Sequence, residues 1–161
     1  MIIHPFKPVI FKESRVLILG SFPSVKSREV DFYYGSKNNR FFKILEVIFD
    51  EKIGESKEAK IDFLKRHKIA LFDVVKSCEI VGSSDSSLSV KEVNDISKLI
   101  ENTDVEKILL NGKKAFEIFQ KYIKIDKVKY FYIPSSSPAN ASFSLDRLVF
   151  EYRKHLEYLK V

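Results

Sequence analysis

The strongest constraint on the fold is a recurring unit in which a short apolar run leads into a loop of small polar residues. Four such runs predict strands, at residues 16–20, 69–72, 105–110 and 128–133. Their apolar residues are continuous, which is typical of strands covered on both faces of a parallel sheet. Amphipathic stretches separate the runs, as in α/β folds. We therefore expect a three-layer α/β/α fold with a central, mostly parallel four-stranded sheet, in one domain.

Helical spacing of apolar residues marks the segments between these strands. An N-terminal arm of about 14 residues precedes the first strand, and Ser144 suits the N-cap of a last helix. The expected helices cover residues 41–49, residues 56–66, the segment after Asn111–Gly112, and the segment from Ser144 onwards.

A Ser-rich loop is expected over residues 76–88, and a further helix after it. Ser89 is followed three positions later by Glu92, which resembles the capping box at a helix start. Apolar residues at Val93, Ile96 and Ile100 would then lie on one face of that helix.

Composition limits the class of protein. Of the 161 residues 45% are hydrophobic and 31% charged, which describes a soluble globular chain. The formal net charge of +6 suits an anionic partner such as nucleic acid. Cys78 is the only cysteine, which excludes an internal disulfide and a four-cysteine metal site. With no signal peptide and no apolar stretch near the roughly 20 residues of a membrane span, we expect a cytoplasmic monomer without membrane contact.

Two of the polar loops lie far apart in sequence and follow the first and the last expected strand. The first begins Gly20-Ser21-Phe22-Pro23 and continues through residues 34–42, and the second is Pro134-Ser135-Ser136-Ser137-Pro138-Ala139-Asn140-Ala141. In an open α/β sheet, the loops at the carboxyl ends of strands meet in one crevice, where ligands bind. The two loops are therefore expected to share a site.

These two loops, with Leu71-Phe72-Asp73-Val74-Val75 and Gly82-Ser83-Ser84-Asp85-Ser86 between them, resemble the uracil-DNA glycosylase superfamily. The likeness is greatest to its hypoxanthine-DNA glycosylase branch and spans residues 16–143. It implies an enzyme that hydrolyses the N-glycosidic bond of deaminated bases in DNA without metal or organic cofactor. The alternative is a non-catalytic nucleic-acid-binding module that retains the crevice. A small-molecule hydrolase is a weaker interpretation, because the Gly-x-Ser-x-Gly elbow is absent.

The resemblance assigns three residues to the chemistry. Asn39 occupies the asparagine position that handles water or the transition state, although it could instead cap the helix that starts at Phe41. Tyr34 would stack on the extruded base, unless it only covers the core edge as Tyr33 could. Asp73 would accept the ring N–H that deaminated bases present, or else brace the Ser-rich loop.

The first loop also departs from the family pattern. Ser21 and Phe22 are expected to line the base site, but Phe22 is apolar where many members carry an acidic or amide residue that activates water. Ser36 stands where related sequences often have histidine, Lys37 replaces a proline and Phe42 a tryptophan. The departure at Phe22 makes Asn39 the main candidate for activating water, whereas those at Ser36, Lys37 and Phe42 bear on the substrate preference. The three histidines, His4, His67 and His155, lie outside the motif loops, so no Ser-His-Asp set is expected.

Several residues are expected to contact DNA rather than the base. Small polar side chains of the second loop could hold phosphates, and the lysines at a helix start could bind them by charge. Phe143 is a candidate wedge for the emptied base stack, or a hydrophobic staple before Ser144. The expected DNA contacts are Arg40, Lys113, Lys114, Ser135, Ser136, Ser137, Asn140 and Phe143.

Overall fold

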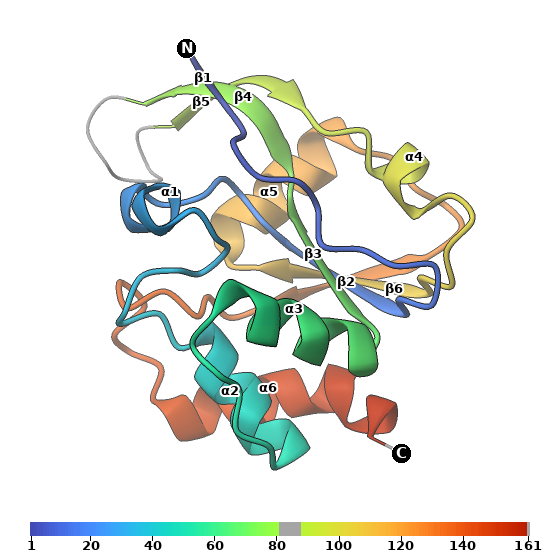
Figure 1. The fold of residues 1–161 in the computed structure, drawn as a ribbon. Coiled ribbons are helices and arrows are strands. Elements are labelled where there is room, and N and C mark those ends of the chain that lie inside the picture. Colours follow the sequence, from blue (N-terminus) through green and yellow to red (C-terminus); the bar gives the residue numbers. More distant parts are fainter. Residues whose placement is uncertain (81–87, 161) are drawn as a thin grey trace.

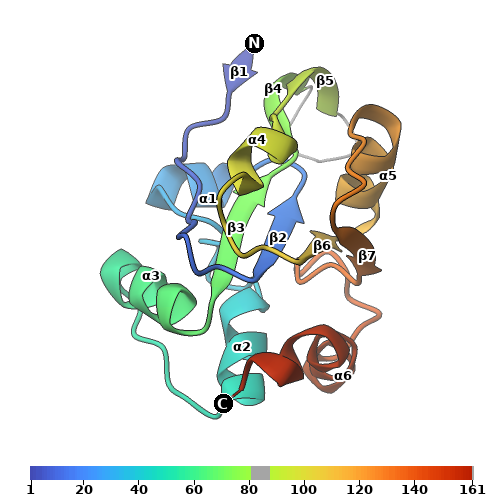
Figure 2. The same ribbon diagram turned by 90° about the vertical axis from the view of Figure 1, so that its right-hand side faces the viewer.

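The computed structural model describes residues 1–80 and 88–160 and has a four-stranded parallel sheet at its centre (Figure 1). The strands are β2 (Val16–Gly20), β3 (Ile69–Asp73), β6 (Lys107–Asn111) and β7 (Lys129–Ile133). Their order in the sheet is β3-β2-β6-β7, and they lie side by side in Figure 2. The register pairs Gly20 with Asp73 and Asn111 with Ile133, so the loops that follow start at one edge.

Both faces of this sheet are covered, as the continuous apolar runs predict. Val16 and Ile18 of β2 pack into one core cluster, and Leu17 and Leu19 pack into another on the opposite face. The first cluster is shared with α2 (Phe41–Phe49), α3 (Lys57–Arg66) and α6 (Leu145–Leu156). The second is shared with α4 (Ile96–Ile100) and α5 (Lys113–Tyr122). The expected α/β class and its parallel four-stranded sheet are confirmed.

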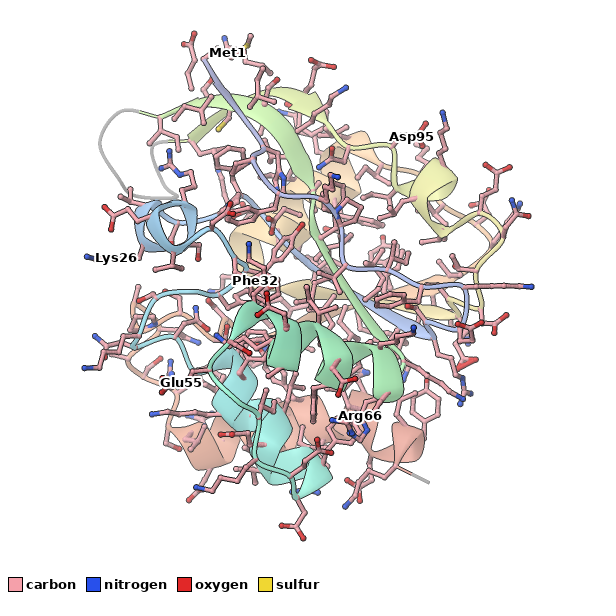
Figure 3. All side chains as sticks on the ribbon, viewed as in Figure 1. Met1, Lys26, Phe32, Glu55, Arg66 and Asp95 are labelled. Atoms are coloured by element: carbon pink, nitrogen blue, oxygen red, sulfur yellow. The ribbon has the colours of Figure 1, made fainter. Side chains whose placement is uncertain are left out.

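The helix boundaries follow local sequence signals. The Ser144 hydroxyl accepts from the Arg147 N–H, which confirms it as the N-cap of α6. A 3₁₀ turn, η2 (Glu157–Leu159), continues α6, and a short helix that the sequence did not predict, α1 (Val25–Val30), follows the first loop. Charged side chains project outward from these elements, such as Lys26 from α1 and Arg66 from α3 (Figure 3).

The helix expected from Ser89 is wrong. Residues 88–93 form β5 (Leu88–Val93), which pairs antiparallel with β4 (Val75–Ile80) where a loop was expected. Buried and exposed positions alternate in β5 between Leu88 and Val90, which is the period of a strand. The helix of this region, α4, starts later, and Asp95 caps it through the Lys98 N–H. The predicted loop motif over 82–86 lies outside the described residues.

The N-terminal arm runs beside β3 and β4. Strand β1 (Ile2–Ile3) pairs antiparallel with β4, and Val9 pairs with Leu71 through two backbone hydrogen bonds of 2.9 and 2.8 Å. Between these anchors, the Tyr33 hydroxyl donates to the Lys7 carbonyl at 2.8 Å. The arm therefore covers the outer edge of the sheet next to the carboxyl end of β3. Across residues 1–80 and 88–160, no helix is long and apolar enough to cross a bilayer.

Candidate active site

A cavity with a volume of about 100 Å³ opens at the carboxyl edge of the parallel sheet. Pockets for drug-sized ligands have about 300–1,000 Å³, so this one suits a single ring system rather than a whole nucleotide. The carboxyl ends of β2, β3 and β6 and the loops after β2 and β7 contribute to its wall. The wall brings together eight of the residues expected at the site: Ser21, Phe22, Tyr34, Asn39, Asp73, Ser135, Ser136 and Ser137.

Glycines allow the strand ends to approach closely enough to form this wall. A Cβ atom at Gly20 would lie 2.5 Å from Oδ1 of Asp73 and 3.4 Å from the Tyr34 hydroxyl. Gly112 has a φ of 100°, and a Cβ there would lie 3.2 Å from Cβ of Ser135. Any side chain at Gly20 would therefore displace the Asp73 carboxylate from the cavity.

Asn39 is held rigidly at the cavity wall. Its Oδ1 accepts the Phe41 N–H, the first of α2, at 2.9 Å, although the N-cap residue itself is Arg40. The same oxygen accepts the Ser136 hydroxyl at 2.9 Å. Since the oxygen must be the acceptor of a backbone N–H, the orientation of the amide is fixed, and among the described residues no acceptor binds its Nδ2. Capping and a role in the cavity are thus compatible.

Behind Asn39 stands a buried network that sequence reasoning missed. Asn111, the last residue of β6, donates from Nδ2 to Oγ of Ser136 at 3.1 Å, and its Oδ1 accepts the Ser136 N–H at 3.1 Å. The hydroxyl of Tyr152 on α6 donates to the Pro134 carbonyl at 2.8 Å and lies 3.2 Å from Oδ1 of Asn111. Burial raises the pKa of Tyr152, so it stays neutral. The available signal was the position of Asn111 at a strand end, although Asn followed by Gly is equally typical of a simple turn.

Tyr34 lies between the cavity and the aromatic core. Its ring stacks on Phe41 with centroids 4.2 Å apart and planes at 22°. Its φ of 51° is in the left-handed region, which bulky residues rarely adopt and which recurs at functional sites. Burial, followed by the nearby charge of Asp73, raises the pKa of Tyr34 well above its usual value. Tyr33 instead anchors the N-terminal arm, so the two tyrosines have different positions.

Asp73 contacts a histidine that no sequence motif places at the site. Nε2 of His4 lies 2.7 Å from Oδ2 of Asp73, and the two side chains are only 3% and 5% exposed. The backbone carbonyl of Asp73 accepts from Nδ2 of Asn94 at 2.8 Å. His4 is far from the motif loops in sequence, and the path of the N-terminal arm, which the sequence did not predict, brings it to Asp73.

The second loop is tied by its own hydrogen bonds and by Arg40. One guanidinium nitrogen of Arg40 donates to the carbonyls of Ser137 and Asn140 at 2.9 and 3.1 Å, and the other donates to the Phe143 carbonyl. Nδ2 of Asn140 donates to the Ser135 carbonyl at 3.0 Å. Arg40 therefore braces the loop from within, and a phosphate contact for it stays a prediction.

The remaining predicted DNA contacts lie beside the base-sized cavity. A second cavity of about 350 Å³ is lined by Lys113, Lys114 and Asn140, and it shares Ser135 and Ser137 with the first. Phe143 is half-buried, with the Arg147 guanidinium 4.4 Å from its ring centroid. Phe143 also packs against the core cluster that contains Leu148, the N4 residue of α6, which is compatible with the staple alternative, and the wedge role remains a prediction.

Phe22 is buried at the cavity wall and has no polar group to offer a water. Its ring meets that of His4 edge-on at 5.8 Å, and the Arg28 guanidinium lies 5.9 Å from its centroid. Two amides on the wall have an oxygen that accepts from two donors, those of Asn39 and Asn111, and the Asn111 Nδ2 already donates to Ser136. In residues 1–80 and 88–160, no group of three or more His, Cys, Asp or Glu side chains could hold a metal ion.

Comparisons with known proteins agree with this geometry. Residues 8–159 match the family model of the uracil DNA glycosylase superfamily. A hypoxanthine DNA glycosylase of Methanosarcina acetivorans is 35% identical over 91% of this chain and 94% of its own length. One of Methanosarcina barkeri is 33% identical over 84% and 86%.

A solution NMR structure of a candidate uracil DNA glycosylase from Methanosarcina acetivorans superposes with a TM-score of 0.84. It is 33% identical in sequence, and the match covers 96% of both chains. The chain belongs to the uracil DNA glycosylase superfamily.

Proposed function

We propose that this protein is a DNA glycosylase that hydrolyses the N-glycosidic bond of hypoxanthine or uracil in DNA and leaves an abasic site. The observation that carries the proposal is the small cavity whose wall combines Asn39, Tyr34 and Asp73. The relatives named as hypoxanthine DNA glycosylases favour an enzyme over a non-catalytic binding module. The net charge of +6 suits a DNA substrate.

The reaction breaks the bond between C1′ and the base nitrogen, whose electron pair leaves with the base. Water forms the new bond to C1′ and releases its proton to solvent. Enzymes that act on a base this way first extrude the nucleotide from the duplex. Tyr34 stacks on the extruded base, and Oδ1 of Asp73, the oxygen that does not face His4, accepts its ring N–H. Cytosine and adenine offer an unprotonated ring nitrogen there and are disfavoured.

Asn39 supplies a fixed dipole at the sugar. Its carbonyl oxygen carries partial negative charge, which stabilises the cation that develops at C1′, and preorganised groups of this kind do not have to reorient during the reaction. Both lone pairs of Oδ1 are engaged, by Phe41 and Ser136. An attacking water that hydrogen-bonds to Oδ1 must therefore replace the Ser136 hydroxyl, while Nδ2 remains available as a donor.

Labelled oligonucleotides with one deoxyinosine or one deoxyuridine test this function. Purified protein should release the free base in the presence of a chelator, and strand cleavage should appear only after alkali. Strand cleavage without alkali, or a borohydride-trapped protein–DNA adduct, would contradict hydrolysis by a monofunctional enzyme. Absence of base release from both substrates would reject the proposal.

A further inference from the structure

We propose that His4 is a positioning residue that keeps one proton on a His4–Asp73 pair while the base departs, and so makes base release depend on pH. This inference rests on the proposed function. His4 does not line the cavity, whereas Asp73 does, so His4 acts through that carboxylate.

The N-terminal arm delivers His4 to Asp73 with little freedom. On one side, the His4 N–H donates to the Lys76 carbonyl at 2.7 Å, which continues the pairing of β1 with β4. On the other side, Val9 pairs with Leu71 of β3. The imidazole is thus held in position from both ends of a short backbone segment, even though 69 residues separate His4 from Asp73.

Within residues 1–80 and 88–160, Asp73 is the one charged side chain that pairs with the imidazole. Four aromatic rings pack around it with centroids 4.9 to 6.0 Å away, those of Phe6, Phe22, Tyr33 and Phe72. The titratable groups nearby are Tyr33, and Tyr34 on the Asp73 side, and burial raises the pKa of both, so both stay neutral. Lys7 and Lys76 contribute only backbone carbonyls, to Tyr33 and His4 respectively. The guanidinium of Arg28 lies over the Phe22 ring, 5.9 Å from its centroid, and the same ring meets the imidazole edge-on.

The backbone of the arm offers Nδ1 of His4 a hydrogen-bond partner in either protonation state of the ring. Nδ1 lies 3.0 Å from the Phe6 carbonyl oxygen and 3.2 Å from the Phe6 nitrogen. A protonated Nδ1 can donate to the carbonyl, and a bare Nδ1 can accept from the N–H. Nε2 can keep its hydrogen bond to Asp73 in both cases, so the pair can gain a proton without moving the ring.

That proton matters when the base leaves. Hypoxanthine departs as an anion, and a lone carboxylate beside it would oppose the reaction by charge repulsion. With His4 protonated, the pair is neutral overall and Oδ1 of Asp73 still accepts the ring N–H. The proton comes from solvent before the reaction and stays on the pair, so none is transferred to the base.

The test is the pH dependence of single-turnover hypoxanthine release by wild type, His4→Gln and His155→Gln. Glutamine keeps an N–H donor for Asp73 but cannot take up a proton in this range. His155 lies on α6 against Phe131 and serves as the matched control. Rates are measured from about pH 5.5 to about pH 9, the range that brackets histidine titration.

The wild-type and His155→Gln rates should fall as pH rises through the titration of the pair. His4→Gln should be about tenfold slower at the acidic end, where it cannot neutralise the charge of Asp73, and should meet the wild-type curve at the alkaline end. Parallel curves for wild type and His4→Gln would overturn the role of His4 and leave the glycosylase function intact. A wild type without base release at any pH would instead reject the function itself.

A second measurement covers the case in which His4→Gln does not fold. The imidazole ¹⁵N shifts of His4 in the wild-type protein report which ring nitrogens carry a proton, and they should change over the same pH interval in which the rate of base release falls. A His4 that stays in one protonation state across the range would also overturn the inference.

Discussion

The two sides of the cavity are built from different chemistry. On one side stand Asn39, Ser136 and Asn111, joined by hydrogen bonds of 2.9 and 3.1 Å, and none of these side chains titrates. On the other side stand Asp73 and His4, both ionisable and both nearly excluded from solvent. The amide side is formed by the segment before α2, the end of β6 and the loop after β7, whereas the ionisable side is formed by the end of β3 and the N-terminal arm.

The difference separates two demands of the proposed reaction. Stabilising a cation at the sugar needs a dipole that is fixed in place at every pH. Distinguishing one base edge from another, and releasing it as an anion, needs hydrogen-bonding groups whose charge can be adjusted. We therefore infer that the amide side sets the rate of scission, and that the ionisable side sets the base preference and the pH dependence.

The largest effect is expected on the amide side. Asn39→Ala removes the aligned dipole and should slow single-turnover base release by about 10²-fold or more, the range for one preorganised group. Asn38→Ala, at the exposed neighbouring position, is the matched control and should keep the wild-type rate. DNA binding by gel shift should be similar for both. Wild-type release by a folded Asn39→Ala protein would remove Asn39 from the mechanism.

Ser136→Ala tests whether the alignment of Asn39 matters as well as its presence. The substitution removes one donor to Oδ1 and leaves Asn111 without its hydroxyl partner. We expect a loss of about tenfold in rate, corresponding to one hydrogen bond of about 1.4 kcal/mol. Ser142→Ala, at an exposed position of the same loop, is the control. Faster release by Ser136→Ala would show that the serine competes with water for Asn39.

Lys113 and Lys114 line the cavity beside the amide side, and their substitution tests whether the DNA backbone lies there. Lys113→Ala with Lys114→Ala should make the plot of log affinity against log salt less steep by about two, one for each lost phosphate contact. Lys121→Ala with Lys124→Ala near the other end of α5 changes the net charge equally and should leave that slope close to wild type. Equal slopes for the two double variants would place the DNA elsewhere.

Asp73→Asn should change base preference by a few-fold, the smallest of these effects. The amide retains an acceptor but adds donors that can face the wrong base edge. The ratio of single-turnover rates on uracil and hypoxanthine is measured with the melting temperature, and Asp146→Asn in the first turn of α6 is the control. A lower melting temperature with an unchanged ratio of the two rates would show that Asp73 stabilises its loop and does not read the base.

Much of this arrangement is predictable from sequence because it depends on short-range signals. Continuous apolar runs identify the four parallel strands, and the carboxyl ends of such strands share one edge of the sheet. That rule alone predicts that Asn39 and Ser136 lie in one site, although 97 residues separate them. The capping signal at Ser144 is also local, and it is confirmed.

The features of the structure that the sequence did not predict depend on contacts between distant segments. The hairpin of β4 and β5 is stabilised by pairing across strands, while Ser89 and Glu92 carry a helix signal that this pairing overrides. His4 meets Asp73 only because the arm runs along β3, and nothing in the residues around His4 encodes that path.

The division between the two sides is tested most directly by the pH profile of single-turnover hypoxanthine release in Asn39→Ala and Asp73→Asn. Asn39→Ala should give a curve parallel to wild type and about 10²-fold lower, since the amide side does not titrate. Asp73→Asn should lose the decline toward alkaline pH that the His4–Asp73 pair imposes. A changed curve shape in Asn39→Ala, or a wild-type shape in Asp73→Asn, would contradict this division of roles.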